Sequence, residues 1–254
     1  AAPCEAKCRR KDIDAAVAIR ALKRFVCEQF GVESERFDVN RVYPATQRAE
    51  RAKLGLGRKV AVVGAGPAGM ACAHDLALMG FNVTVFEAQS MAGGMLTLGI
   101  PQYRLPREII QAEIQAVVSL GVDLRLNSRL GRDYSLASLK QDGFEAIFLA
   151  IGAHKSRELN IEGVELDGTF RAIDYLLNIN LGYRVNLHGK VVVIGGGNVA
   201  FDVARSVVRQ AAHIDDMSPE ALRKILREAT TTLDQLTRGE KEGPEDLKVA
   251  LDVA

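Results

Sequence analysis

The strongest constraint on the fold is the stretch of residues 59–69, where an apolar run leads directly into a glycine-rich turn. Residues 59–63 read KVAVV, and a short continuous apolar run is typical of a strand buried in a parallel sheet. The turn reads GAGPAG, a helical segment follows over residues 70–79, and Gly80 ends it. Residues 82–86 then predict a second strand. This order predicts a parallel βαβ unit.

Each glycine of the turn has a use if the turn binds a diphosphate. Gly64 permits a tight turn out of the strand, Gly66 lets the diphosphate approach the backbone, and Gly69 lets the helix pack against the sheet. The helix that follows, with Pro67 and Ala68 in its first turn, directs backbone amides and a positive dipole end at the phosphates.

Glu87 supplies the acidic residue that such a unit needs about 20 residues further on. It follows the second strand directly, where its carboxylate would accept hydrogen bonds from a ribose and repel a 2′-phosphate. The first site therefore favours FAD or NAD over NADP. The alternative is a glycine turn of an α/β core that binds nothing.

A second strand–turn–helix pattern occurs near the other end of the chain. Residues 190–194 read KVVVI and predict a buried strand, and a helix is expected over residues 199–210. The turn between them offers a second set of candidate nucleotide-binding residues: Gly195, Gly196, Gly197, Asn198 and Val199. Ala200 occupies the third position, a permitted replacement. No partner strand follows it, so this unit is incomplete and the alternative is that it binds nothing.

Composition and charge narrow the remaining classes. A hydrophobic share of 48% and a net charge of +1 over 254 residues describe an ordinary globular protein and argue against nucleic-acid binding driven by overall charge. No apolar run reaches the roughly 20 residues of a membrane span. The first residues lack a signal-peptide layout, so a cytoplasmic location is the default. Because the chain starts at Ala1 and stops within a helical pattern, we expect a fragment.

Four cysteines are present, and they divide by position. Cys4 and Cys8 have a C-x3-C spacing that fits either metal-cluster ligands or inert thiols. Cys27 lies on an apolar stripe that predicts a helix ending near Gly31, and we expect it to be a core residue. We expect Cys72 to pack against the sheet. No C-x-x-C pair is present, which excludes a dithiol relay.

The segment of residues 93–106, GGMLTLGIPQYRLP, resembles a signature of the glutamate synthase small subunit family. That family includes the N-terminal half of dihydropyrimidine dehydrogenase and the large subunit of NADH-dependent ferredoxin:NADP oxidoreductase. Residues 148–153, FLAIGA, are similar to its second FAD motif, and residues 3–10, PCEAKCRR, to its iron–sulfur domain.

The resemblance implies FAD at the first loop, NAD(P)H at the second loop and [4Fe–4S] clusters ligated in part by Cys4 and Cys8. It adds to the FAD site, besides the first loop and Glu87, the residues Gly94, Met95, Arg104, Leu130 and Gly152. Two departures matter. The C-terminal segment that completes the family's flavin site is missing, and two cysteines fall short of the four that a cubane takes.

The sequence thus predicts an α/β protein with two Rossmann-like dinucleotide-binding units, the second incomplete, preceded by a small helical iron–sulfur-type domain. The expected division is 1–57 for the helical domain and linker, 58–187 for the FAD-binding part, and 188–254 for the start of an NAD(P)-binding domain with a polar helical insertion. The expected function is electron transfer between NAD(P)H, FAD and clusters, on to partner redox subunits, with no acid–base catalytic residue. The alternative is a non-catalytic assembly subunit that keeps the fold.

Overall fold

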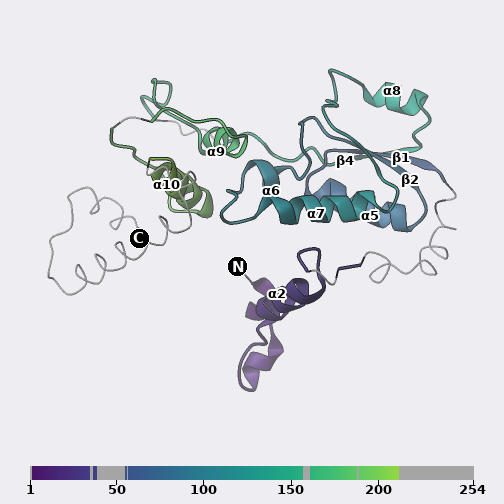
Figure 1. Ribbon diagram of the computed structural model, residues 1–254, viewed down its shortest axis with the longest axis horizontal. Coiled ribbons are helices and arrows are strands. Elements are labelled where there is room, and N and C mark those ends of the chain that lie inside the picture. The colour runs from purple at the N-terminus through teal and green to yellow at the C-terminus, as the bar shows by residue number, and fades with distance from the viewer. Residues whose placement is uncertain are drawn as a thin grey trace. The chain divides into compact units, whose positions relative to one another are not determined.

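The computed structural model describes residues 2–34, 37–38, 55, 57–156, 161–187 and 189–211. The chain divides into two compact units, Ala1–Thr97 with Gln102–Ala153, and Leu98–Pro101 with His154–Ala254. Figure 1 shows the elements along the chain. Among the described residues, no helix has the length and apolar character needed to cross a bilayer.

The first unit is built on a four-stranded parallel sheet in the order β3-β2-β1-β4. Its strands are β1 (Lys59–Val63), β2 (Asn82–Phe86), β3 (Asp123–Arg125) and β4 (Ala146–Leu149). The register pairs Val63 with both Phe86 and Leu149, so β1, β2 and β4 end together at one edge. The turns that carry the predicted site residues therefore leave the sheet from this carboxyl edge.

Helices cover both faces of the sheet, as Figure 1 shows for α5, α7 and α8. One core cluster joins β1 and β2 to α5 (Pro67–Leu78), and side chains of α7 (Arg107–Val118) pack against it. A second cluster joins the opposite face of β1 and β2 to Leu139 of α8 (Leu136–Gln141). The predicted βαβ unit is confirmed, with its helix starting at Pro67 instead of residue 70 because proline fits the first turn of a helix.

The apolar run over residues 146–151 predicts a buried strand, but the strand that forms is shorter and is not buried. It ends at Leu149, and Phe148 and Leu149 are exposed. The physical reason is its position, because β4 has one neighbour, β1, within the described part of the chain. Central strands are covered on two sides, whereas an edge strand keeps one side open.

The N-terminal part contains α1 (Pro3–Ala6), a short 3-10 helix η1 (Arg9–Asp12) and α2 (Ile19–Phe30). Helix α2 ends before Gly31, as predicted. The expectation that Cys27 is a core residue is wrong, since Cys27 is exposed. No residue of α2 is buried, because within the described ranges nothing packs onto its apolar stripe, which includes Leu22, Phe25 and Val26.

The second unit contains α9 (Ala172–Asn180) and α10 (Asn198–Ala211), whereas the short helix α6 (Met95–Leu98) belongs to the first unit except for its last residue. Tyr175 of α9 donates its hydroxyl to Gln210 of α10 at 3.1 Å. The predicted helix over 199–210 is confirmed within a residue at each end.

The strand predicted over residues 190–194 does not form. Val192 and Ile194 are exposed, and the segment pairs with no strand in the described part of the second unit. A parallel strand needs a neighbour for its backbone hydrogen bonds, and an apolar run alone does not supply one. The predicted polar helices of residues 214–250, and most of the linker over 39–57, lie outside the described residues.

Candidate nucleotide-binding site

Two glycines of the first loop are required by the folded chain itself. Gly64 has φ +107°, and a Cβ there would lie 2.3 Å from the carbonyl oxygen of Ala150. A Cβ at Gly69 would lie 1.8 Å from the carbonyl oxygen of Gly64. Glycine at these positions allows the turn out of β1 and the close approach of α5 to that turn, as the sequence predicts.

Gly66 is different, because nothing in the folded chain requires it to be glycine. Its φ of −77° and ψ of −178° are open to any residue. A Cβ there would meet only the Cα of Gly94, at an ordinary contact distance of 3.8 Å. The space beside Gly66 is therefore kept clear for something other than the described chain, and a diphosphate that approaches the backbone would need such a space.

The first turn of α5 presents backbone amides with no acceptor within the described residues. Met70 donates to the carbonyl of Gly66, whereas no such bond is formed by the amides of Ala68 and Gly69. Pro67 occupies the start of the helix, and no side chain caps it. Free amides at the positive end of a helix of 12 residues are suited to bind an anion.

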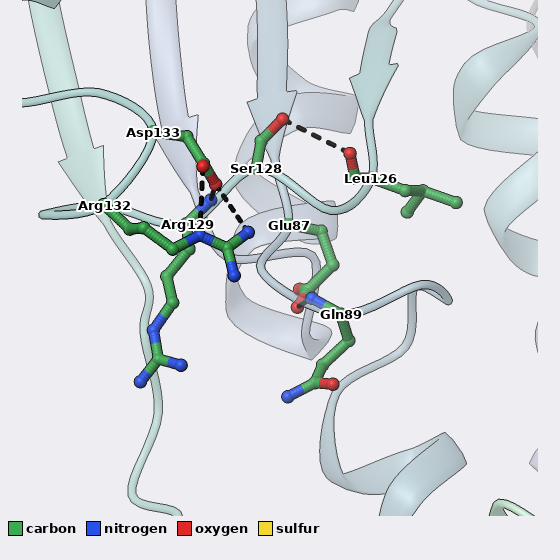
Figure 2. Close-up of polar contacts among 7 residues, drawn as sticks. All are labelled: Glu87, Gln89, Leu126, Ser128, Arg129, Arg132 and Asp133. Atoms are coloured by element: carbon green, nitrogen blue, oxygen red, sulfur yellow. Dashed lines mark hydrogen bonds and ion pairs between the residues drawn. The ribbon is translucent and has the colours of Figure 1, made fainter.

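Glu87 points at the glycine loop. It is 7% exposed, and its two carboxylate oxygens accept the backbone N–H of Ala65 at 2.8 Å and of Gln89 at 2.9 Å. Figure 2 shows the carboxylate beside Gln89, at the end of β2. These two hydrogen bonds fix the carboxylate in place. They leave further lone pairs on its oxygens, so the group can also accept hydrogen bonds from the hydroxyls of a ribose.

A second turn, residues 92–98, lies directly against the first loop. The amide of Gly93 donates to the carbonyl of Ala65 at 2.8 Å, and a Cβ on Gly94 would lie 2.9 Å from the Cα of Gly66. Thr97 holds the turn closed by donating its buried hydroxyl to the carbonyl of Ala92 at 2.9 Å. The structure thus brings Gly94 to the glycine loop, with Met95 as the next residue, whereas Thr97 and Ala65 were not predicted from the sequence.

The three remaining residues predicted to bind FAD differ in their surroundings. Ala150 donates to Val63 at 2.8 Å, so the segment that leads to Gly152 (φ +71°) starts beside Gly64. Leu130 is half-buried and packs against the core cluster under α8. Arg104 is exposed, in the turn before α7. For all three residues, contact with a cofactor stays a prediction.

The second loop belongs to the second unit. Gly195 has φ +126°, and its Cβ would meet the Cβ of Ala200 at 3.5 Å. A Cβ at Gly196 or Gly197 would meet no atom within 4 Å among the described residues. As at Gly66, the fold itself gives no reason for glycine at the last two positions. Asn198 and Val199 begin α10, so a helix N-terminus follows this loop as well.

The cysteines do not form a complete metal site. All four are free thiols, and no group of three or more potential ligands occurs in the part of the chain that the structure describes. Backbone amides, first that of Val17 and then that of Arg10, donate to the sulfur of Cys8 and lower the pKa of its thiol. Burial raises the pKa of the Cys72 thiol, which packs against the sheet core as predicted.

These features define a class. The chain is an α/β protein with a strand–glycine loop–helix unit shaped for a dinucleotide, a buried acidic residue at that loop, and a second glycine loop before another helix. Residues 58–241 match the family described as pyridine nucleotide-disulphide oxidoreductase, and the chain belongs to this family.

Its curated relatives are redox enzyme subunits. The chain is 43% identical over 224 residues to the NADP(+)-dependent formate dehydrogenase subunit beta of Moorella thermoacetica, covering 83% of this chain and 31% of that protein. It is 35% identical over 221 residues to the glutamate synthase [NADPH] small chain of Bacillus subtilis, covering 83% of this chain and 42% of that one. The chain thus spans less than half of either relative, and the expected resemblance to the glutamate synthase small subunit is confirmed.

Solved structures agree on the fold. Mycobacterium tuberculosis FprA in complex with NADPH aligns with a TM-score of 0.53 and 25% identity, over 58% of this chain and 36% of that chain. A 2-naphthoyl-CoA reductase complex aligns with a TM-score of 0.51 and 32% identity, over 61% of this chain and 22% of that one.

Proposed function

We propose that this chain is the cofactor-binding part of a flavin-dependent oxidoreductase subunit that takes electrons from NAD(P)H and passes them to a partner. The observation that carries the proposal is Gly66, a residue that the fold allows to be larger and that the binding of a diphosphate requires to be small. It lies between a helix start with free amides and a buried carboxylate.

The residues of the chain bind and orient the cofactor. The amides of Ala68 and Gly69 would hold the diphosphate of FAD, and the carboxylate of Glu87 would accept hydrogen bonds from the hydroxyls of its ribose. FAD would supply the chemistry, because a flavin takes up one hydride, which carries two electrons, and can give up the electrons one at a time. NAD(P)H docks on the second loop, where Gly196 and Gly197 leave the backbone open. No acid–base residue is needed for hydride transfer.

Iron–sulfur ligation is the finer part of the proposal. Cys4 and Cys8 are the candidate ligands, and the lowered pKa of Cys8 favours the thiolate form that a metal binds. A cubane takes four ligands, and the described residues do not supply them, so no electron-transfer step is assigned to a cluster here.

Partners and setting follow from the same proposal. Relatives named as a subunit or small chain belong to assemblies, and we propose partner redox subunits for this chain. Four free thiols fit a reducing, cytoplasmic compartment. We retain the division into a helical iron–sulfur-type segment (1–57), an FAD-binding part (58–187) and an NAD(P)-binding part (188–254).

The test is anaerobic reduction. The full-length protein, purified with its flavin, is mixed with NADH or NADPH under anaerobic conditions while the flavin absorbance band is recorded. Bleaching by either nucleotide is expected. A flavin that stays oxidised with both would remove the proposed activity. A preparation without flavin that still forms its complex would indicate the alternative, a non-catalytic assembly subunit.

A further inference from the structure

The segment after β3 lies directly beside Glu87. Ser128 donates its backbone N–H to the carbonyl of Glu87 at 2.7 Å, and Asn127 donates to the carbonyl of Gln89 at 2.9 Å. These bonds hold the segment after β3 against the backbone that follows β2. Arg129, the next residue, therefore follows a backbone that is bonded to that of Glu87, whose carboxylate we assign to the ribose.

Asp133 fixes the turn that carries Arg129. Its carboxylate accepts the backbone N–H of Arg129 at 2.8 Å, and its own amide donates to the carbonyl of Arg129 at 2.9 Å. The same carboxylate holds the guanidinium of Arg132 through two bonds, of 3.0 and 2.9 Å. The guanidinium of Arg132 is thus paired with Asp133, and the same carboxylate holds the backbone of Arg129 in position.

The guanidinium of Arg129, unlike that of Arg132, is not bonded to Asp133. It is exposed, and within the described ranges no hydrogen bond or ion pair holds it; the bond from Arg132 is the largest of the influences that lower the pKa of the Asp133 carboxyl, and the charge of Arg129 is the smallest. In Figure 2 its side chain extends away from Asp133, and the side chain of Gln89, drawn below the carboxylate of Glu87, extends in a similar direction. An arginine beside a ribose-binding carboxylate is within reach of the base that the ribose carries.

We propose that Arg129 binds the adenine base of the dinucleotide whose ribose Glu87 holds. The inference rests on the proposed function and adds a residue to its site. A planar guanidinium stacks on an aromatic ring and is less strongly hydrated than an ammonium, so arginine suits this position better than lysine. Arg129 acts in binding and orienting the cofactor, not in the redox step.

The experiment measures the affinity of the full-length apoprotein for FAD, ADP and UDP, in the wild type, Arg129→Met, Arg129→Lys and Lys140→Met. Base stacking is worth about 1–2 kcal/mol, so Arg129→Met is expected to weaken FAD and ADP binding by about five- to thirtyfold. Arg129→Lys is expected to fall between it and the wild type. Lys140→Met removes an exposed charge on α8, which no hydrogen bond or ion pair among the described residues links to Glu87, and serves as the control.

UDP separates base recognition from charge. UDP carries the same ribose and diphosphate as ADP but a smaller base. If Arg129 stacks on adenine, Arg129→Met is expected to weaken ADP binding more than UDP binding, so the ratio of the two affinities should fall below its wild-type value. Equal losses for ADP and UDP, or FAD binding within twofold of wild type, would overturn the proposal. A wild-type protein that binds no FAD would instead refute the proposed function, and this inference with it.

Discussion

The three glycines of the first loop have different roles at the scale of single residues. Gly64 and Gly69 are needed because a side chain would overlap the backbone of the chain itself. Gly66 has room for a Cβ, at 3.8 Å from the nearest atom. Within one motif, the fold therefore requires Gly64 and Gly69, and the proposed ligand requires Gly66. Substitutions at these positions can separate the effect on stability from the effect on binding.

Gly69→Ala is expected to destabilise the protein by about 1–3 kcal/mol, because its Cβ must displace the carbonyl of Gly64 or the start of α5. Gly66→Ala in the same loop is the matched control and is expected to leave the stability unchanged or slightly raised. Urea unfolding of both variants measures the difference. Equal stability of the two would show that the loop relaxes around Gly69, contrary to this account.

The two partly buried cysteines are expected to differ in reactivity with pH. Amide hydrogen bonds lower the pKa of Cys8, whereas burial and then the charge of Asp75 raise that of Cys72. The thiolate is the reactive form, so as the pH rises Cys8 becomes reactive first. Metal-free protein treated with iodoacetamide at about pH 8 should be labelled at Cys8 before Cys72 by peptide mass spectrometry. Faster labelling of Cys72 would contradict the assignment.

At the scale of elements, the turn over residues 92–98 completes the loop that the sequence predicts. Its glycines lie against Ala65 and Gly66, and Thr97 closes it through the carbonyl of Ala92. Arg107 of α7 adds a bond to the carbonyl of Leu96 at 3.1 Å. The turn is thus tied to the glycine loop on one side and to α7 on the other.

Thr97→Val is expected to cost about 1–3 kcal/mol of stability, because it leaves a buried carbonyl without its donor. Thr97→Ser keeps the hydroxyl and should keep most of the stability lost in the valine variant. Thermal or urea unfolding of the pair distinguishes the hydrogen bond from packing. A valine variant as stable as the wild type would show that the hydroxyl bond adds nothing to the stability, contrary to this prediction.

The sequence predicts local elements better than it predicts their neighbours. The unit from Lys59 to Phe86 was predictable because periodicity, glycine spacing and the acid after β2 all agree. That residues 190–194 form no strand was not predictable, because a strand needs a neighbouring strand to pair with and an apolar run does not encode one. In the candidate site, the glycines and Glu87 were predictable from their spacing, whereas no motif marks the contact of Thr97 or the position from which we propose a role for Arg129.

At the scale of the whole molecule, the two units carry one glycine loop each. The first has a sheet, a loop shaped by its own backbone and a buried carboxylate, whereas the second has a loop and helix α10. We therefore expect nucleotide binding by the first loop to be measurable on its own, independently of NAD(P)H. Binding at the second loop needs its own assay.

The most direct measurement is an FAD titration of the full-length apoprotein, wild type and Gly66→Ala, followed by quenching of flavin fluorescence with unfolding curves recorded in parallel. We expect one tightly bound FAD per wild-type chain. In a Gly66→Ala variant as stable as the wild type, we expect FAD binding weakened by about tenfold or more, since a methyl group would occupy the place of the diphosphate. A stable Gly66→Ala protein that binds FAD as tightly as the wild type would contradict it.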